Sequence, residues 1–318
     1  MQNNNLFQGM YNEIQNAHYV LLVTHKNPDA DTLSSGLALS NYFYENKIKH
    51  KVFNISSILP RKLDYLSKFD KITKDVPKYY DLVIYLDCAN KDRVGLEFNS
   101  NIKSISIDHH KSNKNFADIN IIDSTTGSTA ELVYSFFKEN NINISKNVAE
   151  CLYTGIYDDS LGFTTSRTDL KTFDVIRDLL NSNIDISYIA NKLLMRESLS
   201  KFRIVPKILN TLELFYEGKL ATVYLDDSWL IETGATKDEC DDVINQVLSI
   251  GVVEIALYFR VVNNSVRVSL RSKGDIDVSQ IALLFNGGGH QNSAGVSVCS
   301  SNIESVKKEL VKTILNYI

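Results

Sequence analysis

The sequence predicts an α/β fold: an N-terminal, mostly parallel sheet flanked by helices, a helical connector and a smaller C-terminal α+β domain. At 318 residues the chain is long enough for two domains. In its first part, short apolar runs alternate with amphipathic segments, as in the βα units of a parallel sheet. From about Lys219 the strands instead follow one another at hairpin spacing. The expected boundaries are 1–190 for the first domain, 191–215 for the connector and 216–318 for the second domain.

The elements of the first domain follow from the period of their apolar residues. The run 82–86 is apolar throughout, which indicates a central strand buried on both faces. Ser128 and Glu131 form a capping box that opens a helix. The expected strands are 19–24, 50–55, 82–86 and 102–107, and the expected helices are 1–18, 33–44, 128–137, 145–159 and 170–180.

The second domain is preceded by a stretch rich in helix formers, 184–215, which predicts the connector. Asn263 and Asn264 predict a hairpin turn between two strands. We expect the helices to lie on one side of this sheet. The expected strands are 220–225, 252–262, 266–270 and 295–299, and the expected helices are 236–250, 278–285 and 301–318.

Composition excludes several classes of protein. The net charge of −4 argues against a protein that coats long nucleic acid, which needs an extended basic surface. No apolar run approaches the length of a membrane span, and the N-terminus does not resemble a secretion signal, so we expect a cytoplasmic location. The four cysteines are scattered without a C-x-x-C motif, which disfavours a thiolate zinc site.

Acidic and imidazole side chains follow the predicted strands of the first domain. They are His25, Asp29 and Asp31 after the first strand, Asp87 after the third, and Asp108, His109 and His110 after the fourth. Another carboxylate pair, Asp158 and Asp159, ends a helix. The carboxyl ends of parallel strands converge on one crevice, so these side chains are expected to meet. A simple turn would explain the first loop alone equally well, but the recurrence favours a metal site.

This set contains too many carboxylates for a structural zinc site and suits a centre of two divalent ions. Asp87 stands alone at the end of a buried strand, so we expect it to bridge the ions. Two ions about 3.5–4 Å apart can lower the pKa of a shared water and neutralise a phosphoryl oxygen. Mn²⁺ fits a mixed carboxylate and imidazole set best, with Mg²⁺ as the alternative.

The second domain offers a different set: Arg260, Arg267, Arg271, Lys273 and His290. Arg267 and Arg271 lie four apart, so on a strand they share a face. Gly287, Gly288 and Gly289 would let backbone N–H groups approach a phosphate, although a flexible turn also explains them. We expect metals on one domain, substrate capture on the other, and cleavage in the cleft between them.

These motifs, in this order, resemble the DHH phosphoesterase superfamily with a DHHA1 domain, and within it the stand-alone NrnA-type oligoribonuclease and pAp phosphatase group. The matching residues are Thr24-His25-x-x-Pro28-Asp29-Ala30-Asp31, the lone Asp87, Asp108-His109-His110, Asp159 with Phe163, Gly127 to Glu131, Ser269 to Ser272, and Gly287 to His290. The resemblance extends over nearly the whole chain.

The resemblance implies a role for each matching residue. It assigns His25 and Asp29 to one ion, Asp31, His109 and Asp159 to the other, and Asp87 to both. It places His110 near the scissile phosphate and makes Asp108 a residue that orients His109. Arg93, Arg267, Arg271, Gly287, Gly288, Gly289 and His290 are the expected substrate-binding residues.

The chain departs from the family pattern at two places. Asp158-Asp159-Ser160 stands where one aspartate precedes threonine, and the spacing to Phe163 favours Asp159 as the ligand, with Asp158 as the competitor. Asn286 replaces a fourth glycine that is common there; because asparagine tolerates positive φ, we expect the loop to survive.

The function that the resemblance implies is hydrolysis of very short oligonucleotides (nanoRNA) to 5′-mononucleotides, with pAp to AMP as a second activity. The alternatives are a pApA or cyclic di-AMP phosphodiesterase, a single-strand exonuclease of the RecJ type, and a non-catalytic nucleotide-binding protein. The expected partners are short oligonucleotides or a nucleotide 3′,5′-bisphosphate, without long duplex nucleic acid or membrane, and a homodimer is a family-level expectation.

Overall fold

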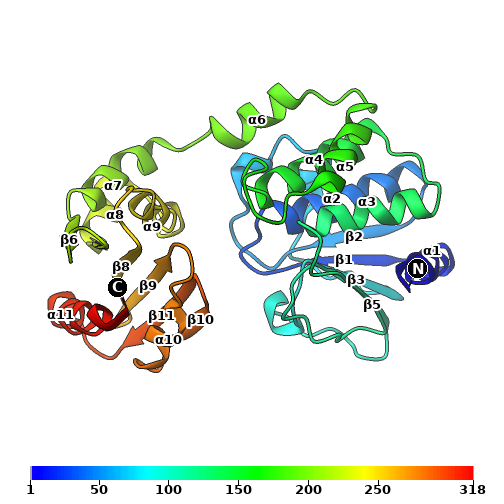
Figure 1. Ribbon diagram of the computed structural model, residues 1–318. Coiled ribbons are helices and arrows are strands. Elements are labelled where there is room, and N and C mark those ends of the chain that lie inside the picture. The colour runs from blue at the N-terminus through cyan, green and yellow to red at the C-terminus, as the bar shows by residue number, and fades with distance from the viewer. Residues whose placement is uncertain (1, 318) are drawn as a thin grey trace. The chain divides into compact units, whose positions relative to one another are not determined.

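The computed structural model describes residues 2–317 and divides into two compact units, Met1–Arg196 and Glu197–Ile318 (Figure 1). The division lies within the stretch predicted as a connector. Helix α6 (Ile186–Leu194) belongs to the first unit, and helix α7 (Leu199–Leu209) belongs to the second. Among the described residues, no helix is both long and apolar enough to cross a membrane.

The first unit is built on a five-stranded sheet in which every neighbouring pair is parallel, which confirms the prediction of a mostly parallel sheet. Its strands are β1 (Val20–Thr24), β2 (His50–Phe53), β3 (Leu82–Leu86), β4 (Lys103–Asp108) and β5 (Ile119–Ile122). The spatial order is β2-β1-β3-β4-β5 (Figure 1). The chain therefore changes direction across the sheet between β1 and β3, and the carboxyl ends of those two strands flank the crevice where such sheets bind ligands. Strand β5 was not predicted.

Five α-helices of this unit cover one face of the sheet. They are α1 (Gln2–Asn16), α2 (Ala30–Glu45), α3 (Thr129–Glu139), α4 (Lys146–Asp159) and α5 (Leu170–Leu180), and α2 to α5 gather on one side of the sheet in Figure 1. Their apolar side chains share a core with Leu22, Ile84 and Ile107 of the strands. The opposite strand residues, such as Leu21 and Val83, form a smaller cluster that loop residues complete. The sheet is therefore buried on both faces, which explains its continuous apolar runs.

Helices α2 and α4 pack closely because Gly155 lies where they meet. A Cβ atom at this position would lie 2.6 Å from Ser34 Oγ, 2.9 Å from Ala130 Cβ and 2.9 Å from Asp31 Oδ1. These neighbours belong to α2 and α3, so the glycine sets the separation of three helices. It also leaves room for the carboxylate of Asp31.

The second unit contains a six-stranded mixed sheet with the order β10-β11-β9-β8-β7-β6. Its strands are β6 (Glu213–Phe215), β7 (Leu220–Leu225), β8 (Ile255–Val262), β9 (Ser265–Ser272), β10 (Gly288–His290) and β11 (Ser293–Val298). Strands β7 and β8 are parallel, and the other neighbours are antiparallel. The predicted turn at Asn263 and Asn264 is confirmed, with positive φ at both residues.

Helices pack on both faces of this sheet, so the prediction of helices on one side is wrong. Helices α10 (Val278–Leu283) and α11 (Ile303–Ile314) cover one core, and α7 and α9 (Val243–Leu248) cover the other. The apolar pattern of the sequence did not predict helices on the second face, because that face is apolar only over β7 and β8. A short helix, α8 (Asp227–Thr233), was not predicted.

The predicted helix 236–250 is also wrong. The segment forms a 3₁₀ turn at Asp238–Cys240 and then the short α9. Its acidic side chains bind elsewhere: Asp241 pairs with Arg260 at 2.7 Å, and Glu239 accepts from the hydroxyl of Ser200 at 3.0 Å. These contacts hold the backbone in a turn.

We expect Gly155→Ala to lower the free energy of unfolding by about 1–3 kcal/mol, because the added methyl group overpacks a close helix contact. The control is Gly9→Ala in α1, where a Cβ would come no nearer than 4.0 Å to Ile119 Cδ1. That change should be neutral or stabilising, since alanine favours helix more than glycine does. Urea denaturation followed by circular dichroism measures both. An unchanged midpoint for Gly155→Ala would contradict the packing argument.

Candidate metal centre

The first loop brings an imidazole and two carboxylates to the carboxyl end of β1. Asp29 caps α2 by accepting from the N–H of Thr32 at 3.0 Å, and the Thr32 hydroxyl donates to the carbonyl of Leu86 at 2.8 Å. The start of α2 is thus fixed to the end of β3. The Nδ1 of His25 faces the carbonyl of Lys26 at 3.0 Å, so its Nε2 points into the site. That atom lies 3.4 Å from Asp29 Oδ2.

Asp87 lies at the centre of the site, close to His25, His109 and His110. It follows β3 directly, and its N–H continues the strand pairing by donating to the carbonyl of Ile107 at 2.9 Å. Its φ of 59° then turns the chain in the left-handed region, which is rare for a residue other than glycine. The side chain is buried, and its Oδ1 accepts from the hydroxyl of Thr129 at 2.8 Å.

Asp31 is buried against the N-terminus of α3. Its Oδ2 accepts from the N–H of Thr129 at 2.7 Å, and its Oδ1 accepts from the N–H of Ala130 at 2.9 Å. The first amides of a helix have no partner within the helix and carry a partial positive charge. They therefore fix this carboxylate while its remaining lone pairs stay available for an ion.

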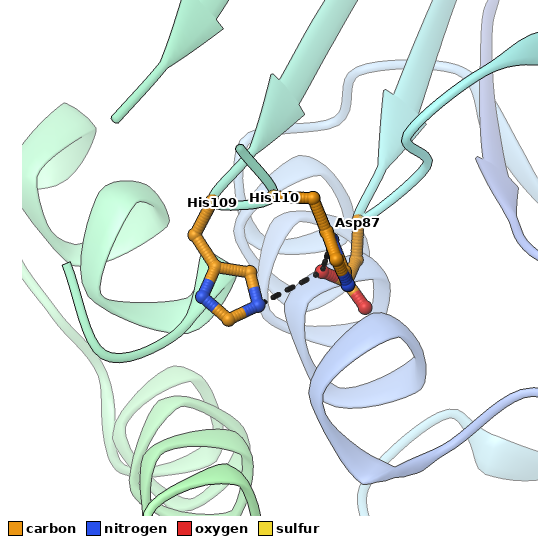
Figure 2. Close-up of side chains that lie close together, drawn as sticks. All are labelled: Asp87, His109 and His110. Atoms are coloured by element: carbon orange, nitrogen blue, oxygen red, sulfur yellow. Dashed lines mark ion pairs between the residues drawn. The ribbon is translucent and has the colours of Figure 1, made fainter. Parts of the chain in front are cut away.

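The two histidines after β4 both point toward Asp87 (Figure 2). His109 Nε2 lies 3.5 Å from Asp87 Oδ1, and His110 Nδ1 lies 3.4 Å from the same atom. His109 is buried, whereas 42% of the His110 side chain is exposed. The same strand end thus supplies one enclosed imidazole and one that solvent or a substrate can reach.

The expectation that Asp108 orients His109 is wrong. Asp108 Oδ1 lies 2.7 Å from His110 Nδ1, and its Oδ2 accepts from Asn113 at 2.7 Å. The Nδ1 of His109 instead faces Arg167 Nη1 at 3.0 Å. Asp108 is the last residue of β4, and its side chain contacts His110. The alternation of side chains along a strand does not predict which of the two histidines it contacts.

The structure separates the two aspartates at the end of α4. Asp159 Oδ2 lies 3.7 Å from His109 Nε2, within the site. Asp158 forms an ion pair with Lys62 at 2.6 Å, away from it. The geometry therefore favours Asp159, the residue that the spacing to Phe163 indicated.

The donor atoms suit metal ions. Three groups, each with its donor atoms within 4.8 Å of one another, could hold an ion: His25, Asp29 and Asp87; Asp31, His109 and Asp159; and Asp87, His109 and His110. Two donors, His25 Nε2 and Asp159 Oδ2, are buried without a hydrogen-bond partner. Buried polar atoms normally have partners, so ligation by an ion would explain both.

The first two groups contain the ligands expected for the two ions. Asp87 was expected in both sets; it is part of the first group but not of the second, and it also belongs to the third group, with His109 and His110. Asp87 lies between the first two groups, with Oδ2 3.5 Å from His25 Nε2 and Oδ1 3.5 Å from His109 Nε2. Its two oxygens thus face different imidazoles, which is the geometry that a bridging carboxylate needs.

Charge repulsion shapes the titration of this site. Burial, together with the nearby charges of Asp87, Asp159 and Asp29, raises the pKa of Asp31 well above its usual range. Burial also raises the pKa of Asp159 to about 6, against the opposing effect of His109. Burial alone would lower the pKa of His25, but its contacts with Asp29 and Asp87 outweigh this and raise the pKa to about 10. Divalent cations would relieve the carboxylate repulsion.

Sequence reasoning missed two residues of the site, Thr129 and Arg167. Thr129 contributes its N–H to Asp31 and its hydroxyl to Asp87, and its place at the start of the capped helix was the available signal. Arg167 reaches His109 and Asp159 from the loop between α4 and α5. No motif in the sequence marks it.

In the second unit, the expected substrate-binding side chains share one face of the sheet. Val266, Val268 and Leu270 point into the core, so Arg267 and Arg271 point to the opposite face, as predicted. Arg271 is paired in register with Ser293, which in turn pairs with His290 of the edge strand. A guanidinium, a hydroxyl and an imidazole therefore form one row across three strands.

The glycines next to this row have a structural role. A Cβ at Gly287 would lie 2.2 Å from the carbonyl oxygen of Gly295, and one at Gly289 would lie 2.4 Å from Ala294 Cα. Two of the three glycines are thus required for the close approach of β10 to β11. A Cβ at Gly288 would meet nothing within 4 Å. The segment expected as a loop is an edge strand, because this approach allows the backbones to pair.

Arg93, the other expected substrate-binding residue, lies in the 3₁₀ turn Lys91–Val94 after β3. Its carbonyl accepts from the N–H of Lys26 at 2.7 Å, which fixes the turn beside the first loop. Its side chain is not part of the three groups that could hold an ion.

A parallel α/β unit with a cluster of carboxylates and imidazoles at its switch point, followed by a mixed-sheet unit with basic side chains on one face, is typical of a hydrolase that uses divalent metal ions. The DHH family, N-terminal domain, matches residues 19–156, and the DHHA1 domain matches residues 217–318. The chain belongs to the DHH family and carries the DHHA1 domain. It is an enzyme of the phosphodiesterase and phosphatase type.

Relatives and a solved structure agree with this assignment. The chain is 25% identical over 298 residues to the bifunctional oligoribonuclease and PAP phosphatase NrnA of Thermus thermophilus, covering 93% of this chain and 89% of that protein. It is 26% identical over 287 residues to the Bacillus subtilis protein of the same name, covering 88% and 90%. An exopolyphosphatase-related protein from Bacteroides fragilis has the same fold, with a TM-score of 0.88 at 24% identity, covering 98% and 96%.

Asp159→Ala should weaken Mn²⁺ binding by at least about tenfold, because it removes a donor atom from the site. Asp158→Ala is the matched control, since that carboxylate pairs with Lys62. Titration with Mn²⁺ followed by calorimetry measures both affinities. If Asp158→Ala had the larger effect, the assignment of the ligand in this pair would be reversed.

Binding of Mn²⁺ at pH 7.5 should release at least about one proton per chain. With a pKa of about 10, the His25 imidazole is protonated at this pH and must lose its proton to bind an ion. The apparent affinity should therefore rise with pH, by about tenfold per unit, up to about pH 10. Calorimetry in buffers of different ionisation enthalpy counts the released protons. A binding enthalpy independent of the buffer would contradict this expectation.

Proposed function

We propose that this enzyme hydrolyses very short oligonucleotides to 5′-mononucleotides and also converts pAp to AMP, with divalent ions, preferably Mn²⁺, at the site in the first unit. The observation that carries the proposal is the pair of donor groups His25, Asp29, Asp87 and Asp31, His109, Asp159, each of which contains one buried donor atom without a hydrogen-bond partner. The relatives named as bifunctional oligoribonucleases and PAP phosphatases support the substrate class.

His25 and Asp29 would hold one ion, Asp31, His109 and Asp159 the other, and Asp87 would bridge them. Ions at this centre would supply an activated water and would neutralise the oxygens of the phosphate. The chain itself fixes the donors: the amides of α3 hold Asp31, and the hydroxyl of Thr129 holds Asp87. These contacts keep both carboxylates in place before a substrate arrives.

His110 is the proposed proton donor to the leaving oxygen. Its Nδ1 faces Asp108 at 2.7 Å, which leaves Nε2 on the other side of a ring that is partly exposed. The hydrogen bond to Asp108 raises the pKa of His110 and so favours the protonated form. An imidazolium with its second N–H turned away from Asp108 can protonate an alkoxide as the ester bond breaks.

The second unit would recognise the nucleotide part of the substrate through Arg267, Arg271 and His290. These donors lie on one sheet face, and Gly288 adds an open backbone position beside them. Guanidinium groups bind phosphate through paired N–H donors. Because the net charge of the chain is −4, long nucleic acid would gain little further attraction. Recognition through a few local donors favours short substrates.

The test is a panel of 5′-phosphorylated oligonucleotides graded by length, together with pAp, pApA and cyclic di-AMP, assayed with Mn²⁺ and with Mg²⁺. We expect the enzyme to turn over the dinucleotide and pAp. Among the oligonucleotides, turnover should fall as the length increases. Asp87→Ala should abolish turnover, because this side chain lies between both donor groups. Wild-type turnover no greater than that of Asp87→Ala on every member of the panel would refute the proposal.

Arg271→Ala serves as the control for the second unit. It should raise KM while the Mn²⁺ content stays unchanged, because Arg271 lies outside the groups that could hold an ion.

The same panel of substrates separates the alternative functions. Preferred hydrolysis of cyclic di-AMP or pApA would identify a second-messenger phosphodiesterase, and preference for long single strands would identify a processive exonuclease.

A further inference from the structure

Arg167 occupies an unusual place beside the metal centre. Its Nη1 lies 3.0 Å from His109 Nδ1, and its Nη2 lies 3.5 Å from Asp159 Oδ2. Within residues 2–317, it is the one lysine or arginine whose side chain has contacts with the candidate ligands in this structure. Yet 43% of its side chain is exposed, so the guanidinium lies at the edge of the site and not inside it.

The loop that carries Arg167 is firmly held. Leu161, Gly162 and Phe163 all have positive φ, a conformation that the surroundings must enforce in a residue such as phenylalanine. The Phe163 ring packs against Tyr157 and Phe173, with ring centres 5.6 Å and 5.5 Å away. The loop therefore has a defined path that ends over the metal centre.

The contact with His109 is chemically incompatible with an ion on the same ring. A guanidinium can only donate hydrogen bonds, so Nδ1 of His109 must accept. An imidazole that binds an ion through Nε2 carries its hydrogen on Nδ1. Two donors would then face each other, and the guanidinium would have to turn away from His109. The carboxylate of Asp159 would hold it less strongly as well, because the ion would take up its charge.

We propose that Arg167 is a phosphate-binding residue, whose guanidinium leaves His109 when an ion binds Nε2 and donates to a non-bridging oxygen of the phosphate being cleaved. The inference rests on the phosphoesterase function proposed above. Arginine suits this role because its paired N–H groups match two phosphate oxygens and keep their charge at any working pH. Developing negative charge on those oxygens strengthens the contact as the bond breaks.

The test compares Arg167→Ala and Arg167→Lys with the wild-type chain loaded with Mn²⁺. We expect Arg167→Ala to keep a content of about two ions per chain while kcat/KM for pAp falls by about 100-fold. Arg167→Lys should recover part of the loss, since lysine retains the charge without the paired donors. The control is Lys62→Ala, which removes the partner of Asp158 at the same end of α4 and should change kcat/KM by less than about twofold.

Two results would overturn the proposal. One is wild-type kcat/KM in Arg167→Ala. The other is a parallel loss of Mn²⁺ and activity, which would show that Arg167 supports the ligands and does not bind the substrate. The affinity of the Mn²⁺-loaded proteins for pAp, measured by calorimetry, tests the role of Arg167 independently of the proposed hydrolysis. If the wild-type chain binds pAp without cleaving it, at least tenfold weaker binding by Arg167→Ala supports the role, and equal binding or no wild-type binding refutes it.

Discussion

The structure of the first unit depends on placing several carboxylates close together in a buried region. Such groups repel one another, and burial makes their charged forms more costly. The fold offsets part of this cost with fixed donors: the amides at the start of α3 bind Asp31, and the hydroxyl of Thr129 binds Asp87. Two of the buried donor atoms, His25 Nε2 and Asp159 Oδ2, are left without a hydrogen-bond partner. This remaining charge and donor capacity is what makes the site suitable for divalent cations.

Much of this arrangement could be predicted because strand ends are easy to recognise. A buried parallel strand is a continuous apolar run, and the residue after it lies at a known edge of the sheet. That rule places His25, Asp87 and His109 together without any knowledge of helix packing. The choice of Asp159 over Asp158 came from the family resemblance, in which the spacing to Phe163 favours Asp159. Sequence reasoning was reliable where a regular element delivers the side chain.

The features that could not be predicted depend on contacts between distant segments. The partner of Asp108 is His110 and not His109, because a rotamer decides which ring it meets. Arg167 reaches the site from an irregular loop, whose path follows from aromatic packing and not from periodicity. Gly287 and Gly289 resembled a phosphate loop, but the backbone contacts of β11 explain them. Each case involves tertiary packing that local patterns do not encode.

The strand order of the first unit has a consequence for how the enzyme matures. The donors extend from His25 to Asp159, and they meet only after β1 has paired with β3 and α3 has docked beside them. Pairings between such distant segments form slowly, because the loop between them must close first. A partly synthesised chain would therefore carry the first loop without its counterpart, and ion capture would be a late event. The complete set of donor atoms therefore exists only in a fully folded first unit.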